Sequence, residues 1–235
     1  MRKQFFGSAV AAIVAACALD AHAALTLLPA QDFPGGGLGA THTILTLQNL
    51  GDFSFEAGSV GRVVFSTTDI ISGDVLTGPS QTQTRSLGAL GIGSAADLRV
   101  VFKPLEPADS LSQGISLNNL QLSIYSPAGA LLFNSGFFEP ATFTDAATGA
   151  GNSGFVFALD PAQQARAQTS AFGTGFSANL VGLSAAASNA TGSFETFYVA
   201  SAIAVAPVPE PESYVLLLVG LAAIRRWRGT RCRWK

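Results

Sequence analysis

Apolar and polar residues alternate in several short segments in the middle of this chain of 235 residues. In residues 98–103, for example, Leu98, Val100 and Phe102 share one face of an extended strand, because successive side chains of a strand point to opposite faces. Glycine and proline lie between these segments, where they favour turns. Many short strands separated by turns predict an all-β, mainly antiparallel fold, with a single β-sandwich or jelly-roll-like domain. The same alternation predicts further strands at residues 43–47, 62–66, 120–125, 155–159, 178–183 and 196–203.

Local patterns predict one hairpin and one short helix within this domain. The sequence Ser-Pro-Ala-Gly at 126–129 lies between two apolar runs and favours a tight turn, with residues 131–133 as the returning strand. Asp160 is a good N-cap, and Pro161 suits the first position of a helix. We therefore expect one helix over residues 162–171, which are rich in helix-forming side chains.

The N-terminus has the pattern of a secretory signal peptide. Two cations precede residues 5–19, which are apolar or small throughout. Ala21 and Ala23 then form the small-x-small pattern that a signal peptidase cuts, so we predict that residues 1–23 form a signal helix that is removed after Ala23. A lipoprotein-like cleavage box at 14–17 and an uncleaved N-terminal helix are the alternatives.

The C-terminus combines three elements in a fixed order. A Pro-Glu-Pro segment comes first, and proline keeps it out of regular helix or strand. An apolar run of residues 214–224 follows, and a tail rich in arginine comes last. The residues that define these elements are Val208, Pro209, Glu210 and Pro211 in the first, Tyr214, Gly220 and Ile224 in the second, and Arg225, Arg226 and Arg228 in the third.

The apolar run predicts a single transmembrane helix that serves as a temporary anchor. It is shorter than the roughly 20 residues that usually span a bilayer, but flanking arginines can reach the interface and the bilayer can thin. The positive-inside rule keeps the arginine tail cytoplasmic and exports everything before it. A C-terminal amphipathic helix packed on the domain is the alternative.

The predicted exported part is acidic. Eight of the 13 Lys and Arg residues and three of the 15 acidic residues lie in the two ends, which leaves five cations and twelve anions in residues 24–206. The resulting net charge of about −7 repels the phosphates of nucleic acid, so we expect no nucleic-acid partner.

The predicted exported part also lacks the side chains of the common catalytic sites. Both cysteines lie in the two ends, and His42 is its only histidine. A Cys–His pair is thereby excluded, as is a zinc site built from several histidines. We expect no enzyme activity, no metal and no cofactor. The alternative is a hydrolase that uses a carboxylate pair drawn from Glu56, Glu106, Glu139 and Glu195.

The three C-terminal elements closely resemble the PEP-CTERM sorting signal of Gram-negative bacteria, whose tail also carries the label "ice-binding protein C-terminal". The resemblance covers about the last tenth of the chain, and the arginine tail runs on further than is usual in the family. It implies recognition by an exosortase, a membrane transpeptidase that cuts near the Pro-Glu-Pro segment. Residues 207–235 would then be the sorting and anchor segment of an inner-membrane precursor, whose exported β-rich domain reaches the outer surface or the extracellular matrix. That middle resembles an uncharacterised domain often found before such tails.

These observations together predict an exported, non-catalytic surface or biofilm-matrix protein. The alternative is a carbohydrate-binding module of the exopolysaccharide matrix, calcium-dependent through the loop at 142–154, in which exposed Tyr125, Tyr198 or Phe138 stack on sugar rings. Ice binding is a weaker idea, based on threonine pairs at 41–43 and 82–84.

Overall fold

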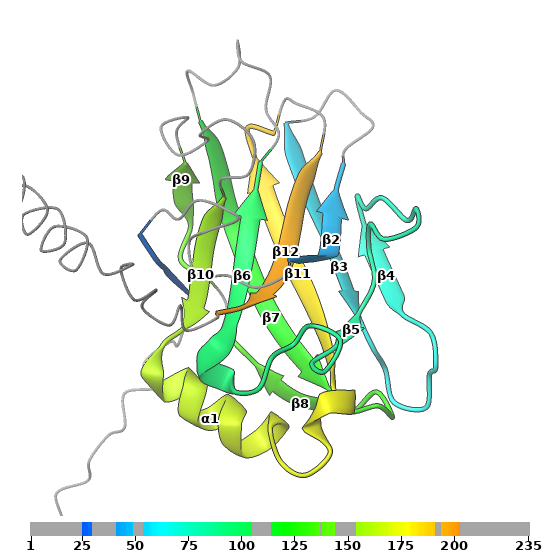
Figure 1. Ribbon diagram of the computed structural model, residues 1–235. Coiled ribbons are helices and arrows are strands. Elements are labelled where there is room, and N and C mark those ends of the chain that lie inside the picture. Colours follow the sequence, from blue (N-terminus) through cyan, green and yellow to red (C-terminus); the bar gives the residue numbers. More distant parts are fainter. Residues whose placement is uncertain are drawn as a thin grey trace, which may run out of the picture.

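The computed structural model describes residues 25–29, 41–48, 54–104, 114–136, 138–143, 154–190 and 194–202 (Figure 1). These residues form two sheets with antiparallel strand pairs, one α-helix and two short 3-10 helices. The all-β, mainly antiparallel prediction is confirmed. The predicted signal peptide with its cleavage site at Ala21 and Ala23, and the whole segment 207–235, lie outside the described residues. No helix of the described part is long and apolar enough to cross a membrane.

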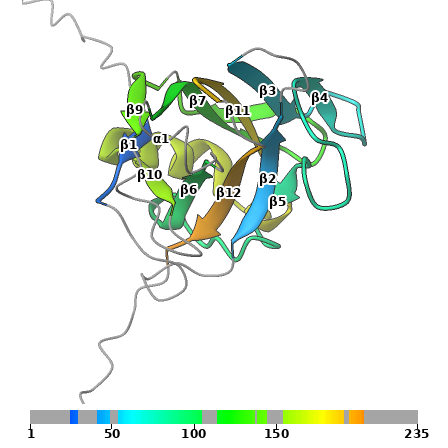
Figure 2. The same ribbon diagram turned by 90° about the horizontal axis from the view of Figure 1, so that it is seen from above.

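The two sheets lie in two layers (Figure 2). The five-stranded sheet has the order β1 (Leu25–Leu27), β10 (Phe155–Leu159), β6 (Leu98–Lys103), β12 (Glu195–Ser201) and β2 (His42–Leu47). The main path of the seven-stranded sheet is β4 (Ile70–Gly73), β3 (Phe55–Gly61), β11 (Leu180–Ser188), β7 (Ile115–Tyr125) and β8 (Leu131–Asn134). Two short strands complete the second sheet, β5 (Arg85–Ser86) on β11 and β9 (Ala141–Phe143) on β7.

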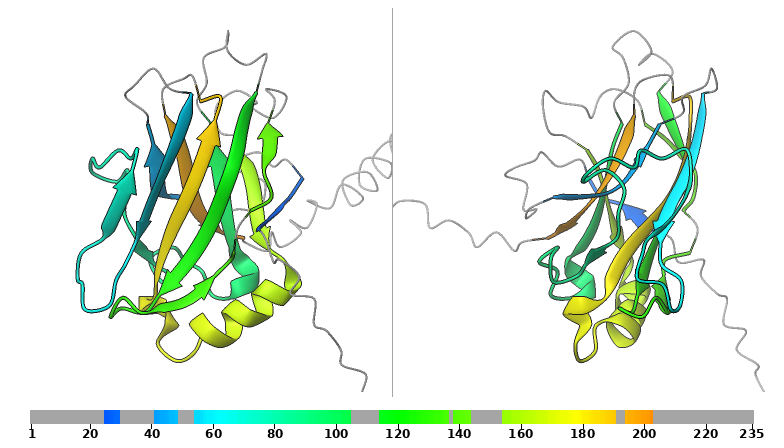
Figure 3. Two further views of the ribbon diagram at one scale, coloured as in Figure 1. Left: turned by 180° about the vertical axis from the view of Figure 1, so that it is seen from behind. Right: turned by 90° about the vertical axis from the view of Figure 1, so that its right-hand side faces the viewer.

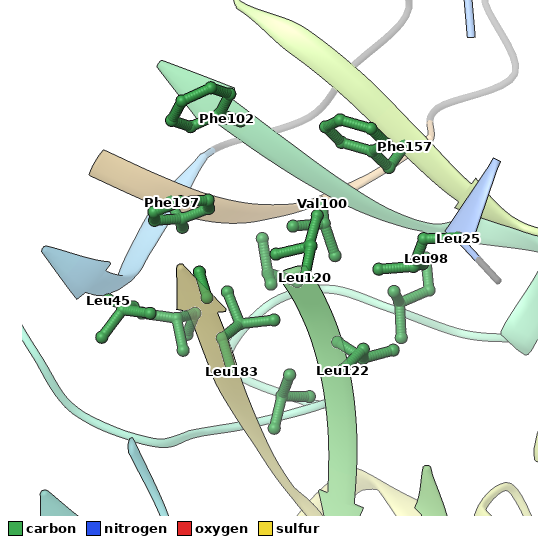
Figure 4. Packing of buried hydrophobic residues seen from close by; sticks show 14 of the residues in the cluster. Leu25, Leu45, Leu98, Val100, Phe102, Leu120, Leu122, Phe157, Leu183 and Phe197 are labelled. Carbon is green, nitrogen blue, oxygen red and sulfur yellow. The ribbon is translucent and has the colours of Figure 1, made fainter. Parts of the chain in front are cut away.

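The alternation seen in the sequence fills one core between the layers (Figure 4). Phe102 of β6 is in register with Phe197 of β12 and with Phe155 of β10, so three aromatic side chains lie side by side on the inner face of one sheet. Leu122 of β7 and Leu183 of β11 are paired in the same way on the inner face of the other sheet. The core is therefore aromatic on one side and mainly aliphatic on the other.

Helix α1 (Pro161–Ala171) crosses one end of the two sheets and contacts β8 of one and β10 of the other (Figure 1). The predicted cap is confirmed, because Asp160 Oδ1 accepts a hydrogen bond of 2.8 Å from the Gln163 amide. The Gln163 side chain is fully buried and donates to the Ser135 carbonyl oxygen at 2.6 Å. The cap and this bond fix the helix against the end of the sheets.

We expect Asp160→Ala to lower the free energy of unfolding by about 1 kcal/mol, since the Gln163 amide then loses its acceptor. Asp160→Asn keeps a side-chain oxygen at the cap and should stay within a few tenths of a kcal/mol of the original. Urea denaturation followed by circular dichroism measures both variants. Equal losses in the two variants would contradict a capping role.

Several strand predictions are confirmed and one is wrong. The segments at 98–103, 120–125 and 155–159 lie in β6, β7 and β10, and the turn at 126–129 joins β7 to β8 as expected. Residues 62–66, in contrast, are a loop, because β3 ends at Gly61 and the chain turns back toward β4. β11 begins at Leu180, after a 3-10 helix at Phe176–Ala178, and β12 covers most of 196–203. Strands β1, β3, β4, β5 and β9 were not predicted.

Candidate functional site

The outer face of the seven-stranded sheet is turned toward the viewer in the left view of Figure 3. It carries a hollow of about 280 Å³, which we call the sheet groove. Its floor is built from neighbouring strands β3, β11 and β7, whose outward side chains are mostly small. Tyr125 is the one aromatic side chain among the described residues that line it. The residues that carry the argument below are Ser59, Gly61, Arg62, Gln121, Tyr125 and Ser184.

Two glycines bring the Tyr125 ring down onto the sheet. A Cβ atom at Gly61 would lie 2.6 Å from the Tyr125 hydroxyl, and a Cβ atom at Gly182 would lie 3.1 Å from Tyr125 Cε2. Tyr125 therefore extends from β7 across β11 as far as β3, over the backbone of both glycines. A larger side chain at either position would displace the ring, so the groove depends on these glycines.

Strand register places polar side chains in a row beside that ring. Ser184 of β11 is paired with Ser59 of β3 on one side and with Gln121 of β7 on the other. The next outward residue of β7 is Ser123, whose hydroxyl accepts a hydrogen bond of 3.0 Å from Asn134 Nδ2. Hydroxyl and amide groups both donate and accept hydrogen bonds. The row therefore offers both kinds of partner to a polar ligand.

The charge at the edge of the groove is neutralised locally. Arg62 Nε lies 2.8 Å from Asp69 Oδ1, with both side chains largely buried. The Asp69 carboxylate also accepts from the Thr84 hydroxyl at 2.6 Å and from the Thr84 amide at 2.9 Å. With the cation paired, and no carboxylate among the described residues that line it, the groove carries no net charge. The same network ties the base of the β3–β4 loop to residue 84.

A second hollow, of about 620 Å³, lies between β8 and α1, and its polar side chains are Asn134, Arg166, Thr169 and Ser170. The hydroxyls of Thr169 and Ser170 each donate to a carbonyl oxygen of their own helix, at 2.9 Å. Its apolar wall comes mainly from strand β8, including the exposed Leu131. We therefore take the smaller sheet groove as the candidate site, because an aromatic ring lies there beside side-chain hydroxyl and amide groups.

The predicted carboxylate pair does not lie in this groove. Glu56 is buried in β3 and Glu195 in β12, so the two belong to different sheets. Glu139 is exposed, and Glu106 lies outside the described residues. Within the described part of the chain, no three His, Cys, Asp or Glu side chains group so that they could hold a metal ion.

The aromatic candidates divide between surface and core. Tyr125 is half-buried and lines the groove, and Tyr198 is half-buried on β12 of the other sheet. The expectation for Phe138 is wrong, because its ring is buried against Phe157 with centroids 5.1 Å apart. The glycine and serine residues of the groove were missed, since small outward residues in a strand give no periodic signal in the sequence.

Other expected ligand residues are buried or lie elsewhere. Thr82 and Thr84 are buried, and the Thr82 hydroxyl accepts from the Thr46 amide at 3.2 Å, so this pair adds nothing to an exposed threonine plane. The central part of the proposed calcium loop, with Asp145 and Asn152, lies outside the described residues. Comparisons of this chain with protein families, with curated proteins and with solved structures found no match.

Proposed function

We propose that this chain is an exported, non-catalytic surface or extracellular-matrix protein, processed near Pro209-Glu210-Pro211 by an exosortase. The observation that carries the proposal is the order of the C-terminal elements: a Pro-Glu-Pro segment, an apolar run and an arginine tail. A signal peptidase removes the N-terminal leader first, and the apolar run then holds the precursor in the inner membrane. The core between the two sheets is built without cysteine in the described residues, so the proposed exported domain does not depend on a disulfide there.

Strand order supports a jelly-roll assignment for the exported domain. One sheet has the order β2-β12-β6-β10 and the other β3-β11-β7-β8. Along the chain, strands β2, β3, β6 and β7 alternate between the sheets, β8 stays in the sheet of β7, and β10, β11 and β12 alternate again, as in two Greek keys. Jelly rolls include lectin domains as well as capsid proteins and cupins, so the fold alone does not assign a function.

Mass spectrometry of the mature protein tests the processing step. The chain is expressed with and without an exosortase in a Gram-negative host, and loss of residues 225–235 is expected only when the enzyme is present. The double variant Pro209→Ala/Pro211→Ala should keep the tail, while Pro207→Ala, just outside the motif, should be cut like the original. Retention of the tail by the original chain beside an active exosortase would refute the proposal.

A second candidate function is glycan binding in the sheet groove. The observation that favours it is the Tyr125 ring beside the row of Ser59, Ser184 and Gln121. An aromatic face attracts the C–H groups of a sugar ring, while hydroxyls and an amide satisfy the sugar hydroxyls. Because no carboxylate is among the described lining residues, the proposed binding does not use calcium there.

A glycan array probed with the mature protein tests this second function. Tyr125→Ala should lower binding about two- to tenfold, because it removes the stacking surface. Thr169→Ala, on α1 and outside the lining of the groove, is the control and should bind like the original protein. A chelator should change nothing. An array without any signal above background would count against glycan binding altogether.

A further inference from the structure

The loop between β3 and β4 exposes three consecutive apolar side chains, Val63, Val64 and Phe65, which we call the apolar loop. Phe65 is 96% exposed, and its backbone has a φ of +67°, a left-handed conformation that bulky residues rarely adopt. Neither property stabilises the fold. Strained, exposed residues of this kind often mark sites where a protein contacts a ligand.

Two hydrogen bonds and an ion pair stabilise the apolar loop. The Phe65 amide donates to the Ala128 carbonyl oxygen at 3.1 Å, which ties the loop to the β7–β8 turn. The Ser66 amide donates to the Val63 carbonyl oxygen at 3.1 Å, and the Arg62–Asp69 ion pair closes the base of the loop. A surface that is already ordered loses little conformational entropy when it binds.

The apolar loop is also continuous with the sheet groove. Val63 lines the groove and is at the same time the first residue of the loop. Phe65 is four residues from Gly61, so its Cα atom lies at most about 14 Å from the glycine beneath the Tyr125 ring. The loop and the β7–β8 turn lie at the same end of the sheet (Figure 3). Phe65 is therefore within reach of a chain molecule that leaves the groove at this end.

We propose that Phe65 forms a second stacking position for one extended, neutral glycan chain whose other units lie in the sheet groove. This inference rests on the proposed glycan binding and adds the form of the ligand, a polymer rather than a single sugar. A glycan chain fits better than an anionic lipid surface, because the exported part has a net charge of about −7. The neutral groove beside the loop equally favours an uncharged polymer.

Affinity electrophoresis of the mature protein tests the proposal. The gels contain laminarin, barley β-glucan, xyloglucan or glucomannan, and the trisaccharide of the retarding polymer then competes for binding. Phe65→Ala should weaken binding of the polymer about two- to tenfold and leave the affinity for the trisaccharide unchanged. Tyr125→Ala should weaken both. Leu27→Ala removes another apolar side chain, 43% exposed on β1 of the other sheet, and should change neither.

The outcomes separate the two proposals. Unchanged polymer binding by Phe65→Ala, together with weakened binding by Tyr125→Ala, would overturn the second stacking position and leave the groove standing. No retardation of the original protein by any of the four polymers would overturn both. Phe65→Ala could instead leave polymer binding unchanged and lose binding to phosphatidylcholine vesicles, which would assign the loop to a membrane and overturn this inference. A loss of self-association without an effect on polymers would assign the loop to contact with a second copy and overturn it as well. Circular dichroism spectra confirm that each variant is folded.

Discussion

Phe102→Ala is expected to lower the free energy of unfolding by about 3–5 kcal/mol. The Phe102 side chain is fully buried, and its ring stacks on Phe197 with centroids 4.9 Å apart. The ring also makes an edge contact with Phe143, with centroids 5.8 Å apart, and a tilted contact with Phe155, with centroids 6.1 Å apart. Alanine would therefore leave a cavity that these three neighbouring rings cannot fill. Because whole domains are stable by only about 5–15 kcal/mol, this single change removes a large share. Urea denaturation measures the loss.

The same substitution at Phe65 is the matched control. That ring is 96% exposed, so Phe65→Ala removes almost no buried surface and should change the free energy of unfolding by about 0.5 kcal/mol or less. Similar unfolding midpoints for the two variants would contradict the core described here. The pair also shows that a glycan-binding defect in Phe65→Ala does not arise from unfolding.

Gly129→Ala is expected to lower the free energy of unfolding by about 2–5 kcal/mol, the second large effect. Gly129 has a φ of +84° in the β7–β8 turn, and an L side chain pays about 1–2 kcal/mol there. Its Cβ atom would also lie 2.0 Å from the Val63 carbonyl oxygen, so the turn and the apolar loop must move apart. Such overpacking costs about 1–3 kcal/mol more. Thermal and urea unfolding both measure the effect.

Gly91→Ala is the control for this prediction. Gly91 has a φ of +66°, but no atom lies within 4 Å of the position that its Cβ atom would take. Gly91→Ala should therefore lower the free energy of unfolding only by the cost of the left-handed backbone conformation, about 1–2 kcal/mol. The difference between the two variants measures the contact between the turn and the apolar loop, and equal losses would mean that this contact contributes nothing. Gly129→Ala should also weaken polymer binding, because it displaces Phe65.

Strands with one aliphatic or aromatic face could be predicted from the sequence, and strands of small residues could not. β6 alternates strongly because Leu98, Val100 and Phe102 all face the core. β3 contains two glycines and an alanine, and the second half of β11 reads Ser-Ala-Ala-Ala-Ser, a composition that does not favour a strand. These two strands are paired within the seven-stranded sheet. Gly61 of β3 and Gly182 of β11 have no side chain there, which leaves room for the Tyr125 ring.

The candidate site was the least predictable part. Tyr125 could be singled out as an aromatic residue on a strand. Ser184, in contrast, is 125 positions from Ser59 and 63 positions from Gln121, and strand register alone brings it beside both. Residues 62–66 alternate like a strand, yet Arg62 pairs with Asp69 and Thr84, and this network turns the chain into a loop. Contacts between residues so far apart in the chain produce no pattern in the local sequence, so they could not be predicted from it.

The sequence by itself determined the all-β class, the hairpin at 126–129 and the capped helix, because each depends on alternation, turn residues or a cap within a few positions. It also supplied the whole basis for the proposed export and processing, since that proposal depends on the composition of the two ends. Only the tertiary structure decided the order of the strands, the neutral groove and the exposure of Phe65. These features arise where strands far apart in the chain come together, and physical contact, not local propensity, fixes them.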